Sequence, residues 1–205
     1  MRCGFRHEKK LRSLGIARIG GVDEAGRGAL AGPVVAAAAI LPERFRHRKL
    51  NDSKQLSPEL RDEIYQNLTT RPDIVWAVGI VDSVEIERIN ILRAAHQAMR
   101  IAVAGLTISP EHALIDGLPV IPFPLPQTAI IDGDCLSLSI AAASVIAKVT
   151  RDTLMREFCA RFPHYCFSQH KGYGTELHLQ KLHEHGPCPI HRRSFEPVAQ
   201  PVFVF

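Results

Sequence analysis

The sequence from Ala17 to Leu41 reads ARIGGVDEAGRGALAGPVVAAAAIL, and it decides much of the fold. Ala17–Val22 and Val34–Leu41 are each predicted to be a strand, with a glycine-rich turn between them. The second strand is nearly all small and apolar, which is typical of a strand buried on both faces. A hairpin is therefore expected here, with Asp23 and Glu24 at the end of its first strand.

Strands and helices alternate after this hairpin. Ser57 is predicted to cap a helix that has Pro58 in its first position, and Asp82 with Glu85 is predicted to open one longer helix that includes Met99. This alternation favours an α/β fold with a mixed sheet. The other expected elements are strands at Asp73–Val81, at His112–Ile115 ending at Asp116 and at Thr128–Ile131, the longest helix at Ser137–Phe162, and a final helix from Thr175 to Gly186-Pro187.

The composition is that of an ordinary globular protein, with 205 residues, 46% hydrophobic residues and a formal net charge of +4. The basic balance favours an anionic partner without proving one. Five cysteines without a C-x-x-C motif argue against a disulfide framework or a structural zinc site, and favour a reducing compartment. The longest apolar runs are too short to cross a bilayer. We therefore expect a cytoplasmic protein with no membrane partner.

Four acidic residues stand at predicted strand ends or turns: Asp23, Glu24, Asp116 and Asp134. Strand carboxyl ends line the crevice where sites form in open α/β sheets, and carboxylate oxygens suit Mg²⁺ or Mn²⁺ better than zinc. Neighbouring strand residues point to opposite faces, so Asp23 and Glu24 can share a site only if the strand ends or twists between them. For any single acid, the alternative is a solvated surface group.

The turn Gly26-Arg27-Gly28 formally begins a G-x-G-x-x-[GA] dinucleotide fingerprint. That interpretation requires a helix to begin at the glycines, whereas Gly32-Pro33 and a strand follow them here. Glycines also let a backbone approach a ligand closely. A contact with a sugar or phosphate is therefore the functional hypothesis for this turn, and a tight hairpin turn is the simpler alternative.

Several ordered motifs together resemble the ribonuclease HII family, the bacterial type 2 class of ribonuclease H. The resemblance spans about residues 19–198, nearly the whole chain, and it leaves the first fifteen or so residues without a match. The motifs are DEAGRG followed by GPVVAAA, then DSKQLS at Asp52–Ser57, Ile115-Asp116-Gly117, AAASVIAKVTRD at Ala141–Asp152, HKGYGT at His170–Thr175, and HRRSFEPV near the C-terminus.

The resemblance implies an RNase H-like mixed sheet flanked by helices, with a small helical C-terminal part. It implies an N-terminal extension at residues 1–16, a catalytic domain at 17–162 and a C-terminal segment at 163–205. Asp23, Glu24, Asp116 and Asp134 match the catalytic, metal-binding acids of the family. The implied reaction is hydrolysis of the RNA strand of RNA–DNA hybrids, and nicking on the 5′ side of single ribonucleotides embedded in duplex DNA, with two divalent ions.

The resemblance also assigns residues that hold the substrate. Gly26-Arg27-Gly28 matches the turn that detects the ribose 2′-hydroxyl, and Tyr173 matches a tyrosine that stacks on a sugar beside the cut. Phosphate contacts are expected from basic residues, for which a solvated surface charge is the alternative; they are Arg27, Lys54, Lys148 and Lys171.

Two alternatives stay open at this stage. One is the type 3 ribonuclease H class, which shares the fold and the acids but typically has a Gly-Lys-Gly turn and an extra N-terminal domain. The other is a duplex-binding module without catalysis, which the presence of all four acids argues against. We further expect a monomer, and the ending Gln200–Phe205 (QPVFVF) faintly suggests a peptide that binds a sliding clamp.

Overall fold

The computed structural model describes residues 3–47 and 49–199, and it contains the expected mixed sheet. The strands are β1 (Ile19–Ala25), β2 (Val34–Ile40), β3 (Val75–Val81), β4 (His112–Asp116) and β5 (Gln127–Ile130). They lie in the order β3-β2-β1-β4-β5. The β1–β2 and β2–β3 pairs are antiparallel, whereas β1–β4 and β4–β5 are parallel. The carboxyl ends of β1 and β4 therefore lie side by side.

The strand β2 is buried on both faces, as its sequence predicts. Ala37 and Ala39 belong to one apolar core, and Val34, Ala36 and Ala38 belong to another on the opposite face of the sheet. Small side chains on both faces let helices pack closely on each side. The same closeness explains Gly21 in β1, where a Cβ atom would collide with the backbone of Ser139.

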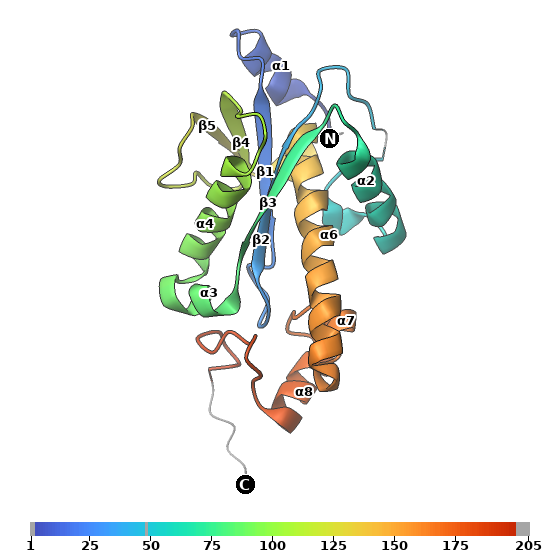
Figure 1. Cartoon of the computed structure of the whole chain (residues 1–205), viewed down its shortest axis with the longest axis vertical. Helices are drawn as coiled ribbons and strands as arrows, with labels where there is room; N and C mark the ends of the chain where they lie inside the picture. Colours follow the sequence, from blue (N-terminus) through green and yellow to red (C-terminus); the bar gives the residue numbers. More distant parts are fainter. Residues whose placement is uncertain (1–2, 48, 200–205) are drawn as a thin grey trace.

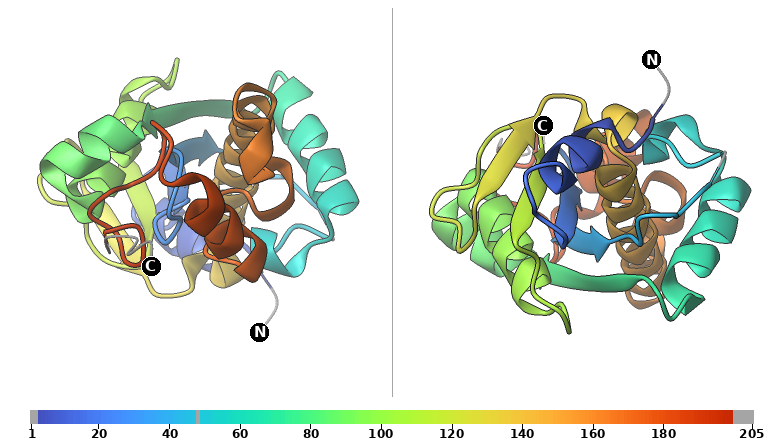
Figure 2. Two further views of the ribbon diagram at one scale, coloured as in Figure 1. Left: turned by 90° about the horizontal axis from the view of Figure 1, so that it is seen from below. Right: turned by 90° about the horizontal axis from the view of Figure 1, so that it is seen from above.

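Helices cover both faces of the sheet (Figures 1 and 2). The pair α3 and α4 packs on one face, and α2 and the long α6 pack on the other. Figure 1 shows that α6 continues beyond the sheet to the C-terminal segment, which lies near the β1–β2 turn. The helices are α1 (Arg6–Arg12), α2 (Pro58–Thr70), α3 (Ser83–Ile89), α4 (Ile91–Ala104), α5 (Gly133–Leu136), α6 (Leu138–Arg161), α7 (Phe167–His170) and α8 (Glu176–His185), with 3-10 turns at Ser53–Gln55 and Pro163–Tyr165.

The helix starts predicted at Ser57 and Thr175 are both capped in the structure. The Ser57 hydroxyl accepts a hydrogen bond from the Leu60 N–H at the start of α2, where Pro58 occupies the first turn. The Thr175 hydroxyl does the same for the His178 N–H at the start of α8. A polar side chain at this position satisfies an N–H that the helix itself leaves free.

The prediction of a single helix from Asp82 onward is wrong, because the structure has two helices there, α3 and α4. The break lies at Asn90, whose φ of 69° and ψ of 163° are incompatible with a continuing α-helix. The Asn90 side chain then accepts a hydrogen bond from Arg93 N–H and caps α4. Helical spacing of apolar residues continues across the break, and this concealed it in the sequence.

No helix within residues 3–47 and 49–199 is both long and apolar enough to span a membrane. The suggested clamp peptide, Gln200–Phe205, lies outside the described residues.

Candidate active site

A pocket of about 540 Å³ opens where β1 ends, next to the end of β4. Its walls come from six places: the end of β1 with the following glycine turn, the 3-10 turn at Ser53–Gln55, α2, the end of β4, α6, and the loop before α8. Most of the predicted site residues line it. The lining residues are Asp23, Glu24, Ala25, Gly26, Arg27, Gly28, Ser53, Lys54, Arg61, Asp116, Ser144, Lys148 and Tyr173.

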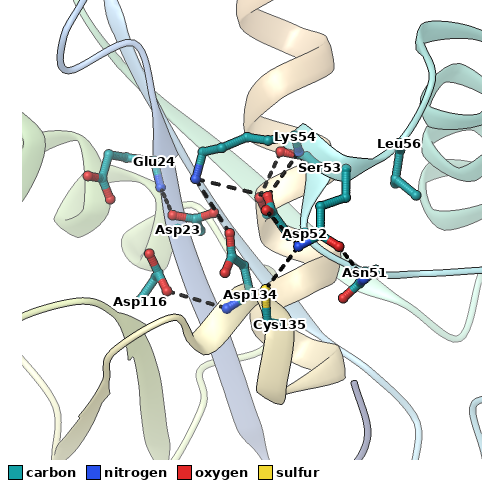
Figure 3. A network of polar contacts seen from close by, with 12 residues as sticks. Asp23, Glu24, Asn51, Asp52, Ser53, Lys54, Leu56, Asp116, Asp134 and Cys135 are labelled. Atoms are coloured by element: carbon teal, nitrogen blue, oxygen red, sulfur yellow. Dashed lines mark hydrogen bonds and ion pairs between the residues drawn. The ribbon is translucent and has the colours of Figure 1, made fainter. Parts of the chain in front are cut away.

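Three of the four predicted acids form one carboxylate group. Asp23 in β1, Asp116 at the end of β4 and Asp134 in α5 each offer an oxygen within 4.8 Å of the others. The Asp134 N–H donates to Asp116 Oδ1 at 3.3 Å, which fixes α5 against the end of β4. Figure 3 shows these side chains converging from three separate elements. Such a set of oxygen donors fits a divalent cation of the Mg²⁺ or Mn²⁺ type.

The electrostatics of this group also fit a cation. Burial raises the pKa of Asp134 to about 6, and the nearby Asp116 and Asp52 carboxylates add to the shift. The pKa of Asp23 is raised well above its usual value, first by burial and then by the Glu24 and Asp116 carboxylates. Burial raises the pKa of Asp116 as well. Like charges crowded in a partly dry site disfavour ionisation, and a bound cation would relieve that repulsion.

Glu24 lines the same pocket, but its carboxylate stands apart from the group of three. Its Oε1 accepts a hydrogen bond from Arg27 Nη1 at 3.1 Å. The strand does not end between the two acids, because β1 stays paired with β2 as far as Ala25. Glu24 nevertheless lies close enough to raise the pKa values of both Asp23 and Asp116.

A second group of donors adjoins the first and shares Asp134. It adds Asp52 and Cys135, which the sequence analysis did not single out as site residues. Lys54 Nζ lies 3.6 Å from Asp134 Oδ2 and 3.9 Å from Asp52 Oδ1. Partial burial lowers the pKa of Lys54, but the carboxylates outweigh that effect and the pKa is raised overall. The exposed Lys54 side chain therefore places a positive charge on the acids from the solvent side (Figure 3).

The two glycines of the Gly26-Arg27-Gly28 turn have different surroundings. Gly26 has a φ of 97°, and a Cβ atom there would collide with the Arg151 side chain beneath it. A Cβ atom on Gly28 would meet nothing within 4 Å. Gly26 is thus needed for packing, whereas Gly28 leaves open space at the wall of the pocket.

Tyr173 also lines the pocket, and its ring lies against two cationic side chains. Arg151 lies 5.2 Å and Lys148 lies 5.5 Å from the centre of its ring. Lys148 Nζ is hydrogen-bonded to Asp152 at 2.7 Å. Lys171 does not line the pocket, and its ammonium group contacts the Ser168 carbonyl instead.

Sequence reasoning missed the residues that support this site from behind. Arg61 donates to the Ser53 and Leu56 carbonyls and lies 3.7 Å from Asp152. Ser144, on α6, donates to the Ser53 hydroxyl at 3.0 Å and lowers the otherwise raised pKa of Asp23. Ser144 lies in the motif AAASVIAKVTRD, but a serine in a motif does not reveal which group it will contact, and Arg61 lies outside every motif singled out in the sequence.

The fold and the clustered aspartates define a metal-dependent nuclease with an RNase H-like architecture. The chain belongs to the ribonuclease HII family, whose sequence profile matches residues 20–198. Ribonuclease HII from Desulfitobacterium hafniense (strain DSM 10664 / DCB-2) is 51% identical over 196 residues, which is 96% of this chain and 75% of the relative. The predicted family is therefore confirmed, and with it ribonuclease H activity on RNA–DNA hybrids that depends on divalent metal.

Solved structures agree on the fold. The ribonuclease H2 from Pyrococcus horikoshii OT3 superposes with a TM-score of 0.71 at 26% identity, covering 89% of this chain and 95% of that one. An RNase HII from Archaeoglobus fulgidus, solved in complex with PCNA, gives a TM-score of 0.71 at 24% identity and covers 87% and 95%. The predicted RNase H-like mixed sheet is confirmed.

Proposed function

We propose that this enzyme cuts on the 5′ side of ribonucleotides, both within the RNA strand of hybrids and at single ribonucleotides embedded in duplex DNA. One observation carries the proposal: a single pocket combines Asp23 and Asp116 of the aspartate group with an open glycine turn and an aromatic ring. The aspartates provide for hydrolysis. The turn and the ring provide for recognition of one sugar, because only the 2′-hydroxyl distinguishes RNA from DNA at a given position.

We assign separate roles in metal binding and substrate binding to the residues of the pocket. Asp23, Asp116 and Asp134 would hold two Mg²⁺ or Mn²⁺ ions, with Glu24 as a further ligand once it leaves Arg27. When bound there, the ions would activate a water molecule and stabilise the leaving oxygen. Lys54 would turn from the acids toward a phosphate, since the cations replace its charge. The Gly26–Gly28 backbone would contact the 2′-hydroxyl, and Tyr173 would stack on the neighbouring sugar.

Arg27 and Lys171 are proposed to hold phosphates of the duplex, in addition to Lys54. These contacts would position the substrate without reading its sequence. Lys148, which lies beside Tyr173, is proposed as a further phosphate ligand that would exchange its contact with Asp152 for the substrate.

A sliding clamp is proposed as a partner on separate grounds. The QPVFVF ending of this chain suggests a clamp-binding peptide. The structurally similar RNase HII from Archaeoglobus fulgidus was solved in complex with PCNA. We further propose that the enzyme acts as a cytoplasmic monomer in DNA replication or repair.

Two labelled duplexes test the substrate proposal. One carries a single ribonucleotide in DNA, and the other pairs an all-RNA strand with DNA; each is incubated with Mg²⁺, Mn²⁺ or EDTA. We expect metal-dependent cutting of both, with the first cut on the 5′ side of its ribonucleotide. Robust cutting of the hybrid alone would refute recognition of a single ribonucleotide and indicate a specificity of the type 3 kind.

A further inference from the structure

The C-terminal segment reaches back to the glycine turn and pairs with it. The Arg192 N–H donates to the Leu30 carbonyl at 2.8 Å, and Gly32 N–H donates to the Ile190 carbonyl at 2.9 Å. From the other side, Leu30 N–H donates to the Gly172 carbonyl at 2.8 Å, next to Tyr173. The chain that follows Gly28 is therefore held between two segments that lie more than 140 residues further along the sequence.

Arg192 makes the most direct of these contacts. Its Nη1 donates to the Arg27 carbonyl at 2.9 Å, at the middle residue of the turn, and its Nε and Nη2 both donate to the Gly32 carbonyl, at 3.1 and 2.9 Å. The side chain is fully buried and packs over the Phe195 ring. Among residues 3–47 and 49–199, no carboxylate forms an ion pair with it.

A buried guanidinium without a carboxylate partner is unusual, because burial of a charge is unfavourable unless its hydrogen bonds are satisfied. Arginine stays charged in proteins, so this side chain depends on the backbone carbonyls of the turn. Packing alone would be served better by an apolar residue. The three hydrogen bonds to two carbonyls instead fix the path of the turn from Arg27 to Gly32.

The planarity of the peptide group carries this effect to the pocket. In a trans peptide the C=O of Arg27 and the N–H of Gly28 point in opposite directions. Because Arg192 holds the Arg27 oxygen toward the protein interior, the Gly28 N–H points away from Arg192. Gly28 lines the pocket, and its N–H has no hydrogen-bond partner among the residues that the structure describes. A free donor is thus fixed in direction at the wall of the pocket.

We propose that Arg192 is a positioning residue that sets the specificity of the enzyme for a single ribonucleotide, by fixing the Arg27–Gly28 peptide that meets the 2′-hydroxyl. This inference rests on the proposed function. A continuous RNA strand offers many 2′-hydroxyls and many neighbouring contacts, so it tolerates a loosened turn. A lone ribonucleotide offers one, so its recognition depends on the direction of one donor.

The test compares Arg192→Met and Arg192→Lys with the wild type. Methionine keeps an unbranched stem without a donor, and lysine keeps the charge but cannot bridge two carbonyls as the guanidinium fork does. The measured quantity is the ratio of kcat/KM for the single-ribonucleotide duplex to kcat/KM for the RNA–DNA hybrid. We expect this ratio to fall about tenfold in both variants, the order that one misaligned hydrogen bond produces.

Two controls separate specificity from stability. Arg193→Met alters the exposed neighbour of Arg192 and should leave the ratio unchanged. Leu68→Ala removes a buried side chain of α2, away from the turn, and should lower thermal stability with no change in the ratio. All proteins are assayed at a temperature at which circular dichroism shows them to be folded.

An unchanged ratio in Arg192→Lys and Arg192→Met would overturn the inference. Failure of Arg192→Lys to fold would overturn it as well, because the residue would then hold the fold rather than the turn. These outcomes differ from failure of the proposed function, in which the wild-type enzyme itself would not cut the single-ribonucleotide duplex.

Discussion

At the scale of single residues, the three aspartates explain why this pocket suits hydrolysis with metal. Asp23, Asp116 and Asp134 are brought within 4.8 Å of one another although they lie far apart in the sequence. Their ionisation is disfavoured by burial and by mutual repulsion. Protons and divalent cations therefore compete for the same oxygens, and metal binding should release protons.

This competition predicts how metal binding depends on pH. The pKa of Asp134 is raised to about 6, so its carboxylate is progressively protonated as the pH falls below that value. Mn²⁺ affinity, measured by isothermal titration calorimetry between pH 5 and 7.5, should therefore fall steeply below about pH 6. Asp134→Asn should bind Mn²⁺ more weakly at pH 7.5 and with a shallower pH dependence. Equal pH dependence in the two proteins would contradict the assignment.

The two glycines of the turn provide a matched pair of substitutions. Gly26→Ala should destabilise the fold by about 1–3 kcal/mol, because its positive φ and the Arg151 side chain both oppose a Cβ atom. Gly28→Leu should leave stability nearly unchanged, since the space there is open, but should severely reduce cutting at a single ribonucleotide. Urea unfolding and the cleavage assay measure the two effects. Similar stability losses in both variants would refute the distinction.

At the scale of elements, the N-terminal segment completes the first turn of α6. The Leu138 N–H donates to the Gly4 carbonyl at 3.2 Å, and the Ser139 N–H donates to Glu8 Oε1 at 3.0 Å. The same Glu8 oxygen accepts from the Ser137 hydroxyl at 2.6 Å. Residues that resemble nothing in the family motifs thus hold the start of the helix that directly follows the Asp134 segment.

Removal of this cap should be measurable. Glu8→Ala leaves buried donors without an acceptor, so the free energy of unfolding should fall by about 1–3 kcal/mol. Because α6 begins only four residues after Asp134, cleavage should fall as well. Lys9→Ala, an exposed neighbour on the same helix, serves as the control. If the urea unfolding midpoints of both variants equal that of the wild type, the capping role is wrong.

The sequence predicted the elements well where the signal is local. The hairpin follows from small apolar residues and glycines, and the starts of α2 and α8 follow from Ser57 and Thr175. The break at Asn90 was missed because a local asparagine turn interrupts a continuing helical pattern. The cap by Glu8 was missed because its partners lie about 130 residues away.

The same limit applies to the site. The carboxylates could be predicted because strand ends and motifs mark them. The cluster of His170, His178 and His191 could not, since its members come from three segments that only folding brings together. These buried rings contact one another. His178 Nδ1 also lies 3.0 Å from the Tyr173 carbonyl oxygen. They form part of the support beneath Tyr173.

At the scale of the whole molecule, a formal net charge of +4 should attract a nucleic acid through its phosphates. If Arg27, Lys54 and Lys171 each hold a phosphate, duplex binding should weaken as salt rises, with a log–log slope of about −3. Lys171→Gln should reduce the steepness by about one, whereas Lys10→Gln on α1 should not. Fluorescence anisotropy between 50 and 300 mM salt measures this, and a flat dependence would exclude the proposed contacts.

The central claim is that the Asp23, Asp116 and Asp134 group performs the hydrolysis. The most direct measurement is made on Asp116→Asn, which keeps the shape of the side chain and can still accept the Asp134 N–H. Hybrid binding by anisotropy should stay near the wild-type level, while cleavage at saturating Mg²⁺ should be abolished. Turnover close to that of the wild type would contradict the account.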